Sequence, residues 1–490
     1  MVAAPSSGAG KTTVTCAILA ILKNRGLKPV SFKCGPDFID PMFHRTVLGI
    51  ESENLDTFLA GTDGVKRLIA GRFTDQDTSG LSDCAVIEAV MGLYDGTGPD
   101  SDSGSSYEIA KLTDTPIILV VDAHGIGRTV ISIIKGVLAD DTAKLIKGVI
   151  LNRMSEGFYA RIAPVIRSEL QNIRSDVNLI GYIPKSDGIS IESRHLGLVL
   201  PGEIENIQNR IFEAAQILQS GCNIDSILEI MNNADSIPCT DTVRDTSAVS
   251  CPLSGGGAGC FRENPPATAP VTGRISSGSN RNFRIAVALD EAFCFYYPEN
   301  LRHLERCGCN LTFFSPIRDR KLADDTDAIL IGGGYPELYL DKLSSNKTML
   351  DSIRKAIDDH IPSIAECGGF MYLHGIIEDK DKKEYEMVGA IDGRCTYTGH
   401  LVNFGYTQIK SVRSSLPDEL CKGLAGMRGH EFHYYDSSCK ACDAMLCKPS
   451  NGREYEGMIT DSGRLWGWPH LYYDSAPKAL EVFLRINEHG

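Results

Sequence analysis

The sequence lacks long apolar runs and an excess of positive charge. No stretch approaches the roughly 18 to 20 consecutive apolar residues that a membrane-spanning helix requires, so we expect no membrane association. The 49 Lys and Arg residues are outnumbered by 63 Asp and Glu residues, which gives a formal net charge of −14. Because proteins that bind nucleic acid neutralise phosphates with clustered Lys and Arg, we expect no nucleic-acid partner.

The cysteines lack the spacing of a disulfide framework. Sixteen of them are scattered over 490 residues, and no secretory signal pattern stands in front of them. We therefore expect a cytoplasmic protein with reduced thiols. Cys439 and Cys442 form a pair, but only Cys447 lies close by, and this spacing matches no zinc template.

The length predicts more than one domain, and the first part of the chain has the pattern of a doubly wound α/β domain. Short apolar runs without alternation recur there, as is typical of buried parallel strands, and stretches suited to helices lie between them. The predicted strands are residues 29–33, 84–88, 117–122, 146–152 and 178–184. We assign residues 1–234 to this domain.

A change of composition marks the boundary of a second domain. Residues 235–282 are rich in Ser, Gly, Pro and Thr without apolar periodicity, which predicts a flexible linker, although a long surface loop is the alternative. The strand pattern returns from residue 283, with predicted strands at 283–289, 327–331 and 361–366. Residues 283–490 are therefore predicted to form a second α/β domain.

A glycine-rich loop near the start of the chain predicts a phosphate site. Residues 3–13 read Ala-Ala-Pro-Ser-Ser-Gly-Ala-Gly-Lys-Thr-Thr and precede a helical pattern at 14–24. Backbone N–H groups of such a loop surround phosphate oxygens at the helix N-terminus, the lysine reaches the β and γ phosphates, and the first threonine can ligate Mg²⁺. The expected ATP-binding residues are Gly8, Gly10, Lys11, Thr12 and Thr13.

This loop departs from the usual pattern at Pro5, where a first glycine is expected. Only four residues precede Pro5, which leaves a very short strand, so a truncated start remains open. The Gly-Lys-Thr-Thr sequence is also used by partition-type ATPase switches, which dimerise on a partner and need no second active site.

Four carboxylates follow predicted strands of the first domain. Glu88 ends the strand at 84–88, where α/β sheets place their ligands, and is the expected metal carboxylate beside Thr12. Asp95 lies between glycines, and Asp37 and Asp40 lie in a turn stiffened by two prolines. We expect these three aspartates to position substrate or phosphate, with plain acidic or capped turns as the alternative.

In the second domain, Cys367 has the context of a nucleophile. It follows a buried strand pattern and precedes two glycines and a helix, which predicts a tight turn with an exposed thiol of lowered pKa. Backbone amides of Gly333, Gly334 and Gly368 are expected to form an oxyanion hole, unless these glycines only serve a tight turn.

The base for this thiol must come from elsewhere in the chain. His470, in Trp-Pro-His-Leu-Tyr, is the preferred candidate, whereas His430 and His433 compete for the role and are expected to be structural or to face substrate.

Several of these segments resemble one family. Lys-Cys-Gly-Pro-Asp-Phe-Ile-Asp-Pro at 33–41 and Ile-Glu-Ala-Val-Met-Gly-Leu-Tyr-Asp-Gly at 87–96 are similar to motifs of the cobyrinate a,c-diamide synthase family of corrinoid glutamine amidotransferases. Further similar segments are 54–56, 148–153, 181–184, 192–198 and 429–434. The resemblance makes Asn152 a candidate for binding adenine, with a strand-capping asparagine as the alternative.

The resemblance implies a P-loop doubly wound domain followed by a triad-type glutamine amidotransferase domain. Such amidotransferase domains commonly carry a glutamate two residues after the histidine, where this chain has Tyr472. The corrinoid amidotransferases also lack that glutamate, which implies a dyad of Cys367 and His470.

The implied activity is that of a carbon–nitrogen ligase of cobalamin biosynthesis, which uses ATP, Mg²⁺ and glutamine to amidate the a- and c-acetate groups of cobyrinate through an acyl phosphate. Hydrogenobyrinate or nickel-sirohydrochlorin remain alternative substrates. A homodimer is a further expectation, and the order of amidations and the ammonia route stay open.

Overall fold

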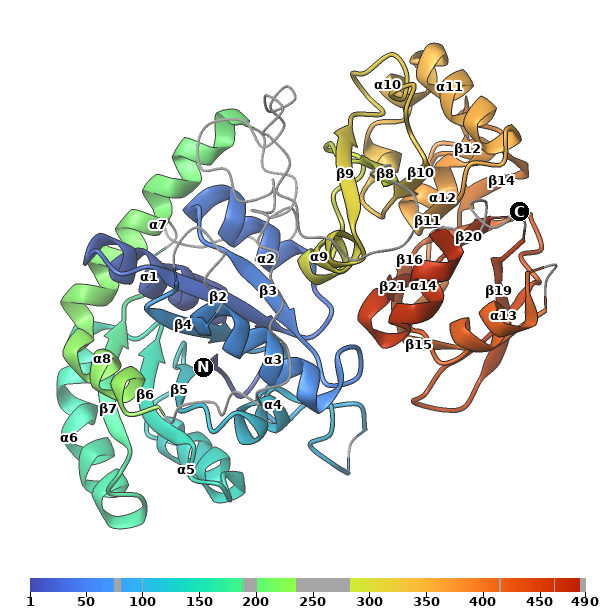
Figure 1. The fold of residues 1–490 in the computed structure, drawn as a ribbon. Helices are drawn as coiled ribbons and strands as arrows, with labels where there is room; N and C mark the ends of the chain where they lie inside the picture. Colours follow the sequence, from blue (N-terminus) through green and yellow to red (C-terminus); the bar gives the residue numbers. More distant parts are fainter. Residues whose placement is uncertain are drawn as a thin grey trace. The chain divides into compact units, whose positions relative to one another are not determined.

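The chain forms two compact units (Figure 1). The computed structural model describes residues 1–74, 81–98, 100–186, 188, 201–234, 283–413, 416–461 and 463–484. The first unit contains the described residues up to 234, and the second contains those from 283 onward. The predicted linker at 235–282 and the motif at 192–198 lie outside the described residues.

The first unit is built on a seven-stranded parallel sheet with the order β3-β2-β4-β1-β5-β6-β7. The five strands predicted here are confirmed, each to within one residue at either end, because buried parallel strands read as unbroken apolar runs. The strands are β1 (Val2–Ala3), β2 (Pro29–Cys34), β3 (Ser52–Leu55), β4 (Cys84–Glu88), β5 (Ile117–Asp122), β6 (Ile146–Asn152) and β7 (Asn178–Ile183).

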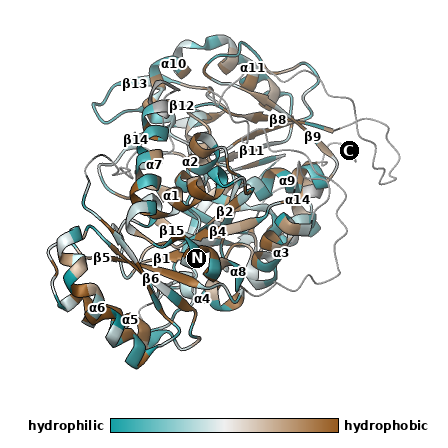
Figure 2. Cartoon of the chain, turned by 90° about the vertical axis from the view of Figure 1, so that its left-hand side faces the viewer, coloured by the Kyte–Doolittle hydropathy of each residue, from teal (hydrophilic) through white to brown (hydrophobic). Residues whose placement is uncertain are grey.

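Helices cover both faces of this sheet. Ile118 and Val120 of β5 pack with α1, α7 and α8, whereas Leu119 and Val121 pack with α4, α5 and α6. Figure 2 shows β5 and β6 coloured mainly as hydrophobic and α5 and α6 in both colours, as expected for strands buried between amphipathic helices. The helices are α1 (Lys11–Asn24), α2 (Ile39–Phe43), the π-helix η1 (His44–Leu48), α3 (Gly61–Thr74), α4 (Ser106–Leu112), α5 (Thr129–Asp140), α6 (Glu156–Ile173), α7 (Pro201–Gly221) and α8 (Ile224–Asn232). The predicted doubly wound fold is confirmed.

The second unit contains a ten-stranded mixed sheet with the order β21-β16-β15-β18-β19-β20-β11-β10-β8-β9. Strands β20 to β9 in this order are parallel, and the others are antiparallel. Its strands are β8 (Phe283–Ala288), β9 (Cys309–Phe314), β10 (Ala328–Ile331), β11 (Ser363–Glu366), β15 (Asn403–Val412), β16 (Arg428–His433), β18 (Ala444–Cys447), β19 (Glu454–Ile459), β20 (Arg464–Gly467) and β21 (His470–Tyr472).

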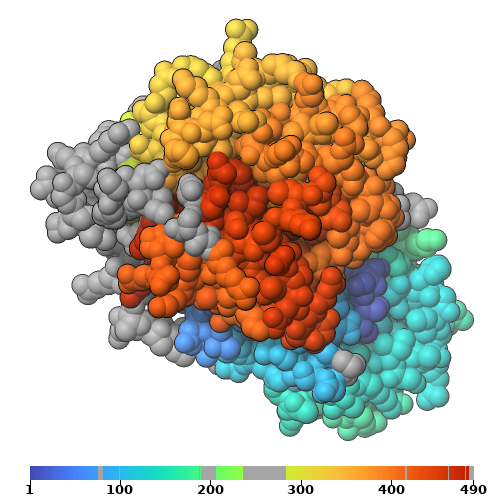
Figure 3. All heavy atoms as spheres, turned by 90° about the vertical axis from the view of Figure 1, so that its right-hand side faces the viewer, coloured from blue at the N-terminus to red at the C-terminus, as the bar shows by residue number. Residues whose placement is uncertain are grey.

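A smaller four-stranded sheet and a set of helices complete the second unit. The small sheet has the order β13-β12-β14-β17, and Figure 3 shows a face on which the later residues of this unit, coloured orange to red, form much of the surface. These strands are β12 (His374–Glu378), β13 (Glu384–Glu386), β14 (Ile391–Tyr397) and β17 (Tyr435–Ser437), and the helices are α9 (Pro298–Arg306), η4 (Pro336–Leu338), α10 (Leu340–Ser345), α11 (Lys347–Asp358), α12 (Gly368–Tyr372), α13 (Asp418–Leu424), η5 (Tyr473–Ser475) and α14 (Pro477–Leu484).

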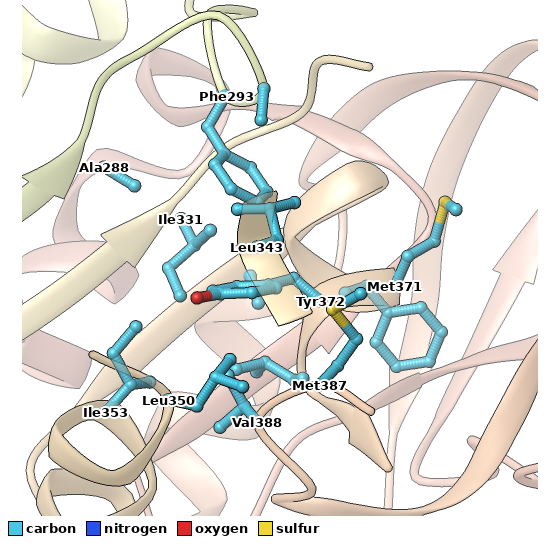
Figure 4. Packing of buried hydrophobic residues seen from close by; sticks show 14 of the residues in the cluster. Ala288, Phe293, Ile331, Leu343, Leu350, Ile353, Met371, Tyr372, Met387 and Val388 are labelled. Atoms are coloured by element: carbon cyan, nitrogen blue, oxygen red, sulfur yellow. The ribbon is translucent and has the colours of Figure 1, made fainter. Parts of the chain in front are cut away.

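The core of the second unit anchors the short helix α12. Tyr372 at the end of this helix is fully buried, and Figure 4 shows its ring among Ile331, Leu343 and Met387. Burial of an aromatic side chain stabilises by a few kcal/mol, on the order of 3 to 5 kcal/mol on truncation to alanine, so α12 and the residue before it are held firmly. Among the described residues, no helix has the length and apolarity needed to cross a bilayer.

Candidate functional site

The residues predicted for the nucleotide site converge on one edge of the first sheet. The glycine-rich loop follows β1, and β1 lies between β4, which ends at Glu88, and β5. Asn152 ends β6, the next strand beyond β5. In open α/β sheets this carboxyl edge is the usual ligand site.

The loop has the conformation of a phosphate cradle. Gly8 and Gly10 have φ angles of 75° and 95°, which other residues rarely adopt. Lys11 is 8% exposed, and its ammonium donates to the carbonyls of Met91 at 2.5 Å and Ser6 at 3.1 Å. Burial and, after it, the nearby Lys33 ammonium lower the pKa of Lys11 to about 8. Thr13 is half-buried at the start of α1.

Asn152 supports this loop. Its Nδ2 donates to the carbonyl of Ala9 at 2.8 Å, and its Oδ1 accepts the backbone N–H of Arg153 at 3.0 Å. A Cβ added to Gly10 would lie 2.3 Å from that Nδ2, so glycine is needed here for the close approach as well as for its φ angle. Adenine binding by Asn152 stays a prediction.

Thr12 and Glu88 are hydrogen-bonded to each other at the end of β4. The Thr12 hydroxyl donates to Glu88 Oε1 at 2.6 Å, and the Lys33 ammonium lies 2.9 Å from the same oxygen and 2.5 Å from Asp40 Oδ2. Glu88 is fully buried, and burial and, next, the Asp40 carboxylate raise its pKa to about 7. The Lys33 ammonium therefore partly offsets two buried carboxylates.

These residues fit a magnesium ion. Mg²⁺ prefers hard oxygen ligands and commonly takes one or two carboxylates together with phosphate and water oxygens. Within the described part of the chain, Glu88 Oε2 is buried and accepts no hydrogen bond, and no group of three or more His, Cys, Asp or Glu side chains is arranged to hold a metal alone. Thr12 and Glu88 would thus be the protein's share of the ligand shell.

The three predicted positioning aspartates differ in burial and in their contacts. Asp37 is half-buried and accepts the N–H of Ile39 at 2.8 Å, and burial and then Asp40 raise its pKa to about 6. Burial alone would raise the pKa of Asp40, but the Lys33 ammonium holds it below its usual value. Asp95 is exposed and accepts the N–H of Gly92 at 2.8 Å, so it stabilises its own turn. Substrate contact by these aspartates stays a prediction.

Cys367 occupies a strained turn between β11 and α12. Its φ and ψ are 49° and −105°, a combination that non-glycine residues rarely adopt outside functional sites. Its N–H donates to the carbonyl of Gly467 on β20 at 2.8 Å. The expected exposure and lowered pKa are wrong: the residue is 7% exposed, and burial and, next, the Glu337 carboxylate raise the thiol pKa. The five-residue helix is too short to outweigh this desolvation.

His470 and the glycine loop lie side by side. A Cβ added to Gly333 would lie 2.1 Å from His470 Cε1, and one added to Gly368 would lie 3.2 Å from the nitrogen of Gly334. Gly333 therefore lies against the His470 imidazole, and Gly368, which directly follows Cys367, lies against Gly334. Burial and, next, His430 lower the pKa of His470 to about 3, so the imidazole is neutral.

The competing histidines have other contacts. His433 stacks on Trp468 with ring centroids 4.0 Å apart and an interplanar angle of 6°, and its Nδ1 lies 2.8 Å from the carbonyl of Tyr435. His430 pairs across the β16 and β21 strands with His470. These contacts are compatible with the structural role expected for both.

Sequence reasoning missed two buried ionisable residues at these sites. The motifs around Lys33 and Glu366 predict no role for either side chain. A lysine inside a buried strand is rare unless it is paired, and this feature could have drawn attention to Lys33. Glu366 had no comparable indication, because its partners lie more than a hundred residues away.

A P-loop sheet and a cysteine–histidine unit on one chain define the class of nucleotide-binding glutamine amidotransferases. The CobQ/CobB/MinD/ParA nucleotide binding domain family matches residues 1–199, and the CobB/CobQ-like glutamine amidotransferase domain family matches residues 284–477.

Relatives named cobyrinate a,c-diamide synthase narrow this class. The protein from Thermoplasma volcanium is 37% identical over 434 residues, which are 88% of this chain and 84% of the relative. The protein from Listeria innocua is 35% identical over 486 residues, with 98% and 97% covered, and that from Picrophilus torridus is 33% identical over 485 residues, with 99% and 98% covered. The chain belongs to the cobyrinate a,c-diamide synthase family.

Proposed function

We propose that this protein uses ATP and glutamine to convert the a- and c-acetate carboxylates of cobyrinate to amides. The observation that carries this proposal is the presence of two complementary sites on one chain of this family. One is a phosphate loop backed by Glu88, and the other is a strained cysteine turn next to a glycine loop that contacts a neutral histidine. One site activates a carboxylate, and the other supplies ammonia.

Activation takes place at the phosphate loop. A carboxylate oxygen of the substrate attacks the γ-phosphorus of ATP, ADP leaves, and an acyl phosphate forms. Backbone N–H groups of Gly8 and Gly10 and the Lys11 ammonium stabilise the charge that spreads over the phosphoryl oxygens. Mg²⁺, held by Thr12 and Glu88, would supply further positive charge there. Asp37, Asp40 and Asp95 would position the substrate.

Ammonia is released at Cys367. The His470 imidazole, which is neutral, accepts the thiol proton as Sγ attacks the amide carbon of glutamine. Amides of Gly334 and Gly368 stabilise the oxyanion, and the His470 imidazolium returns its proton to the amide nitrogen, which leaves as ammonia. Water then hydrolyses the thioester to glutamate and frees the thiol. Ammonia then attacks the acyl phosphate, phosphate leaves, and the amide remains.

Mass spectrometry of the tetrapyrrole tests this function. Cobyrinate incubated with the protein, ATP, Mg²⁺ and glutamine is expected to gain two amides, and Lys11→Ala is expected to abolish the gain with either glutamine or ammonium. Parallel reactions with hydrogenobyrinate and nickel-sirohydrochlorin determine which tetrapyrrole the protein amidates.

If only hydrogenobyrinate or only nickel-sirohydrochlorin is amidated, that compound and not cobyrinate is the substrate. ATP hydrolysis that needs no tetrapyrrole and is unchanged in Cys367→Ser would instead support an ATPase switch and contradict the proposal.

A further inference from the structure

The strand that carries His470 lies at the edge of the ten-stranded sheet. β21 pairs on one side only, with β16, and the paired residues are His430 with His470, Gly429 with Leu471, and Arg428 with Tyr472. All three residues of β21 are buried. Backbone groups on the free side of a buried strand need other hydrogen-bond partners, because leaving them unpaired costs free energy.

Side chains supply those partners. Asn300 Nδ2, from α9, donates to the carbonyl of Leu471 at 2.7 Å, and the Glu366 carboxyl accepts the N–H of Leu471. Both backbone groups of Leu471 therefore point away from β16, as they do at a non-hydrogen-bonded position of an antiparallel pair.

The same two side chains also bind Tyr473. Asn300 Oδ1 accepts the N–H of Tyr473 at 2.9 Å, and the Tyr473 hydroxyl donates to Glu366 Oε1 at 3.0 Å. Asn300 and Glu366 thus bind the free side of β21 where a further strand would otherwise pair. Since Leu471 follows His470 directly, this contact fixes the backbone on which the imidazole is mounted.

Glu366, unlike Asn300, is also adjacent to the nucleophile in the sequence. It is the last residue of β11 and is bonded covalently to Cys367. A single side chain therefore joins the residue before the nucleophile to the residue after the base. Both ends of this connection are rigid, because Tyr473 is 1% exposed and β11 is buried throughout.

The environment of Glu366 does not fit an ion pair. The residue is 5% exposed, and within the described residues no Lys, Arg or His lies in salt-bridge contact with it. Burial raises its pKa to about 8. A buried carboxyl without a cation is costly to maintain, and the hydrogen bonds from Leu471 and Tyr473 are its observed contacts.

We propose that Glu366 is the positioning residue of the Cys367–His470 pair: its carboxyl accepts hydrogen bonds from the Leu471 N–H and the Tyr473 hydroxyl and so fixes strand β21, and with it the imidazole, relative to the nucleophile. In this chain Glu366 acts through the backbone, whereas the glutamate expected two residues after the histidine is replaced by Tyr472. The inference rests on the proposed glutaminase role of Cys367 and His470.

Three variants test it. Glu366→Leu removes both acceptors at similar volume, Glu366→Gln retains an acceptor oxygen, and Tyr473→Phe removes only the hydroxyl donor. Each is assayed for amidation of cobyrinate with glutamine and, separately, with ammonium. The ratio of the two activities isolates the glutaminase site from the ATP site.

Glu366→Leu is expected to lower the glutamine-dependent kcat about 10- to 100-fold, since small misplacements of a catalytic group have effects of this size. The KM for glutamine and the ammonium-dependent rate are expected to stay unchanged. Tyr473→Phe is expected to lower the ratio less, and Glu366→Gln to restore most of it.

A matched control is Tyr107→Phe in the first unit, which removes a hydroxyl donor that lies 3.0 Å from the Asp141 carboxylate. It loses a hydrogen bond of the same kind and is expected to leave the ratio unchanged.

The outcomes separate the two proposals. An unchanged ratio in folded Glu366→Leu, or in Tyr473→Phe if the leucine variant does not fold, overturns the positioning role. A rise in the KM for glutamine without a change in kcat also overturns it, because Glu366 would then act on substrate. Wild-type protein that amidates with neither nitrogen source contradicts the proposed function itself.

Discussion

Replacing Gly333 with alanine perturbs His470 directly, because the two residues touch. An ideal Cβ on Gly333 would lie 2.1 Å from His470 Cε1 and 3.0 Å from its Nδ1. Carbon atoms in favourable contact lie about 3.5 to 4.0 Å apart, so the imidazole must move by more than about 1 Å. A misplacement of about 1 Å can lower a rate about 100-fold, which corresponds to about 2.7 kcal/mol of transition-state free energy.

The assay compares glutamine-dependent and ammonium-dependent amidation of cobyrinate by Gly333→Ala. The glutamine-dependent kcat/KM is expected to fall about 100-fold, and the ammonium-dependent value to stay the same. Gly375→Ala is the matched control in the same unit, because its added Cβ would meet its nearest atom, the Gly393 carbonyl oxygen, at 3.4 Å. A folded Gly333→Ala protein with unchanged glutamine-dependent kcat/KM would refute the assignment of His470 as the base.

Two further predictions concern ATP binding and pH. Gly10→Ala is expected to weaken ATP binding, measured by calorimetry, at least about 10-fold, because the added Cβ would lie 2.3 Å from Asn152 Nδ2. The control is Gly136→Ala, whose added Cβ would meet nothing within 4 Å and which should leave ATP binding unchanged. Burial raises the pKa of Glu366 from 4.5 to about 8. Between these pH values the folded state therefore retains a proton that the unfolded state releases. As a result, the free energy of unfolding of the wild type falls as the pH rises. Glu366→Gln has no carboxyl at this position and lacks this loss. The free energy of unfolding of the variant minus that of the wild type, measured in urea, should therefore increase from pH 4.5 to 8. A difference that stays constant over this range would contradict the prediction.

The parallel strands could be predicted because strands buried on both faces have mainly apolar sequences without alternation. Strands β4, β5 and β6 are mainly apolar and each ends at a polar residue, and their observed bounds equal the predicted ones. β21 has no such pattern, since it is three residues long and its hydrogen-bond partners come from β16, α9 and β11. Pairing between distant segments is set by tertiary packing, which local pattern does not encode.

The same difference applies to the sites. Lys11, Thr12 and Glu88 could be picked out because strand ends and a glycine loop place ligands in known positions. The state of Cys367 could not, because its pKa depends on how deeply the second unit buries the turn, and a short helix N-terminus counts for less than desolvation. The link from Glu366 to Tyr473 spans 107 residues of sequence and could be seen only in the fold.

The most direct test of the account is the nitrogen source used by Cys367→Ser. Cobyrinate, ATP and Mg²⁺ are incubated with this variant and either glutamine or ammonium, and the amides formed are counted by mass spectrometry. The account predicts two amides with ammonium and none with glutamine, because only the release of ammonia requires the thiol. Amidation with glutamine by this variant, or loss of amidation with both sources in a folded protein, would contradict the division of labour between the two sites.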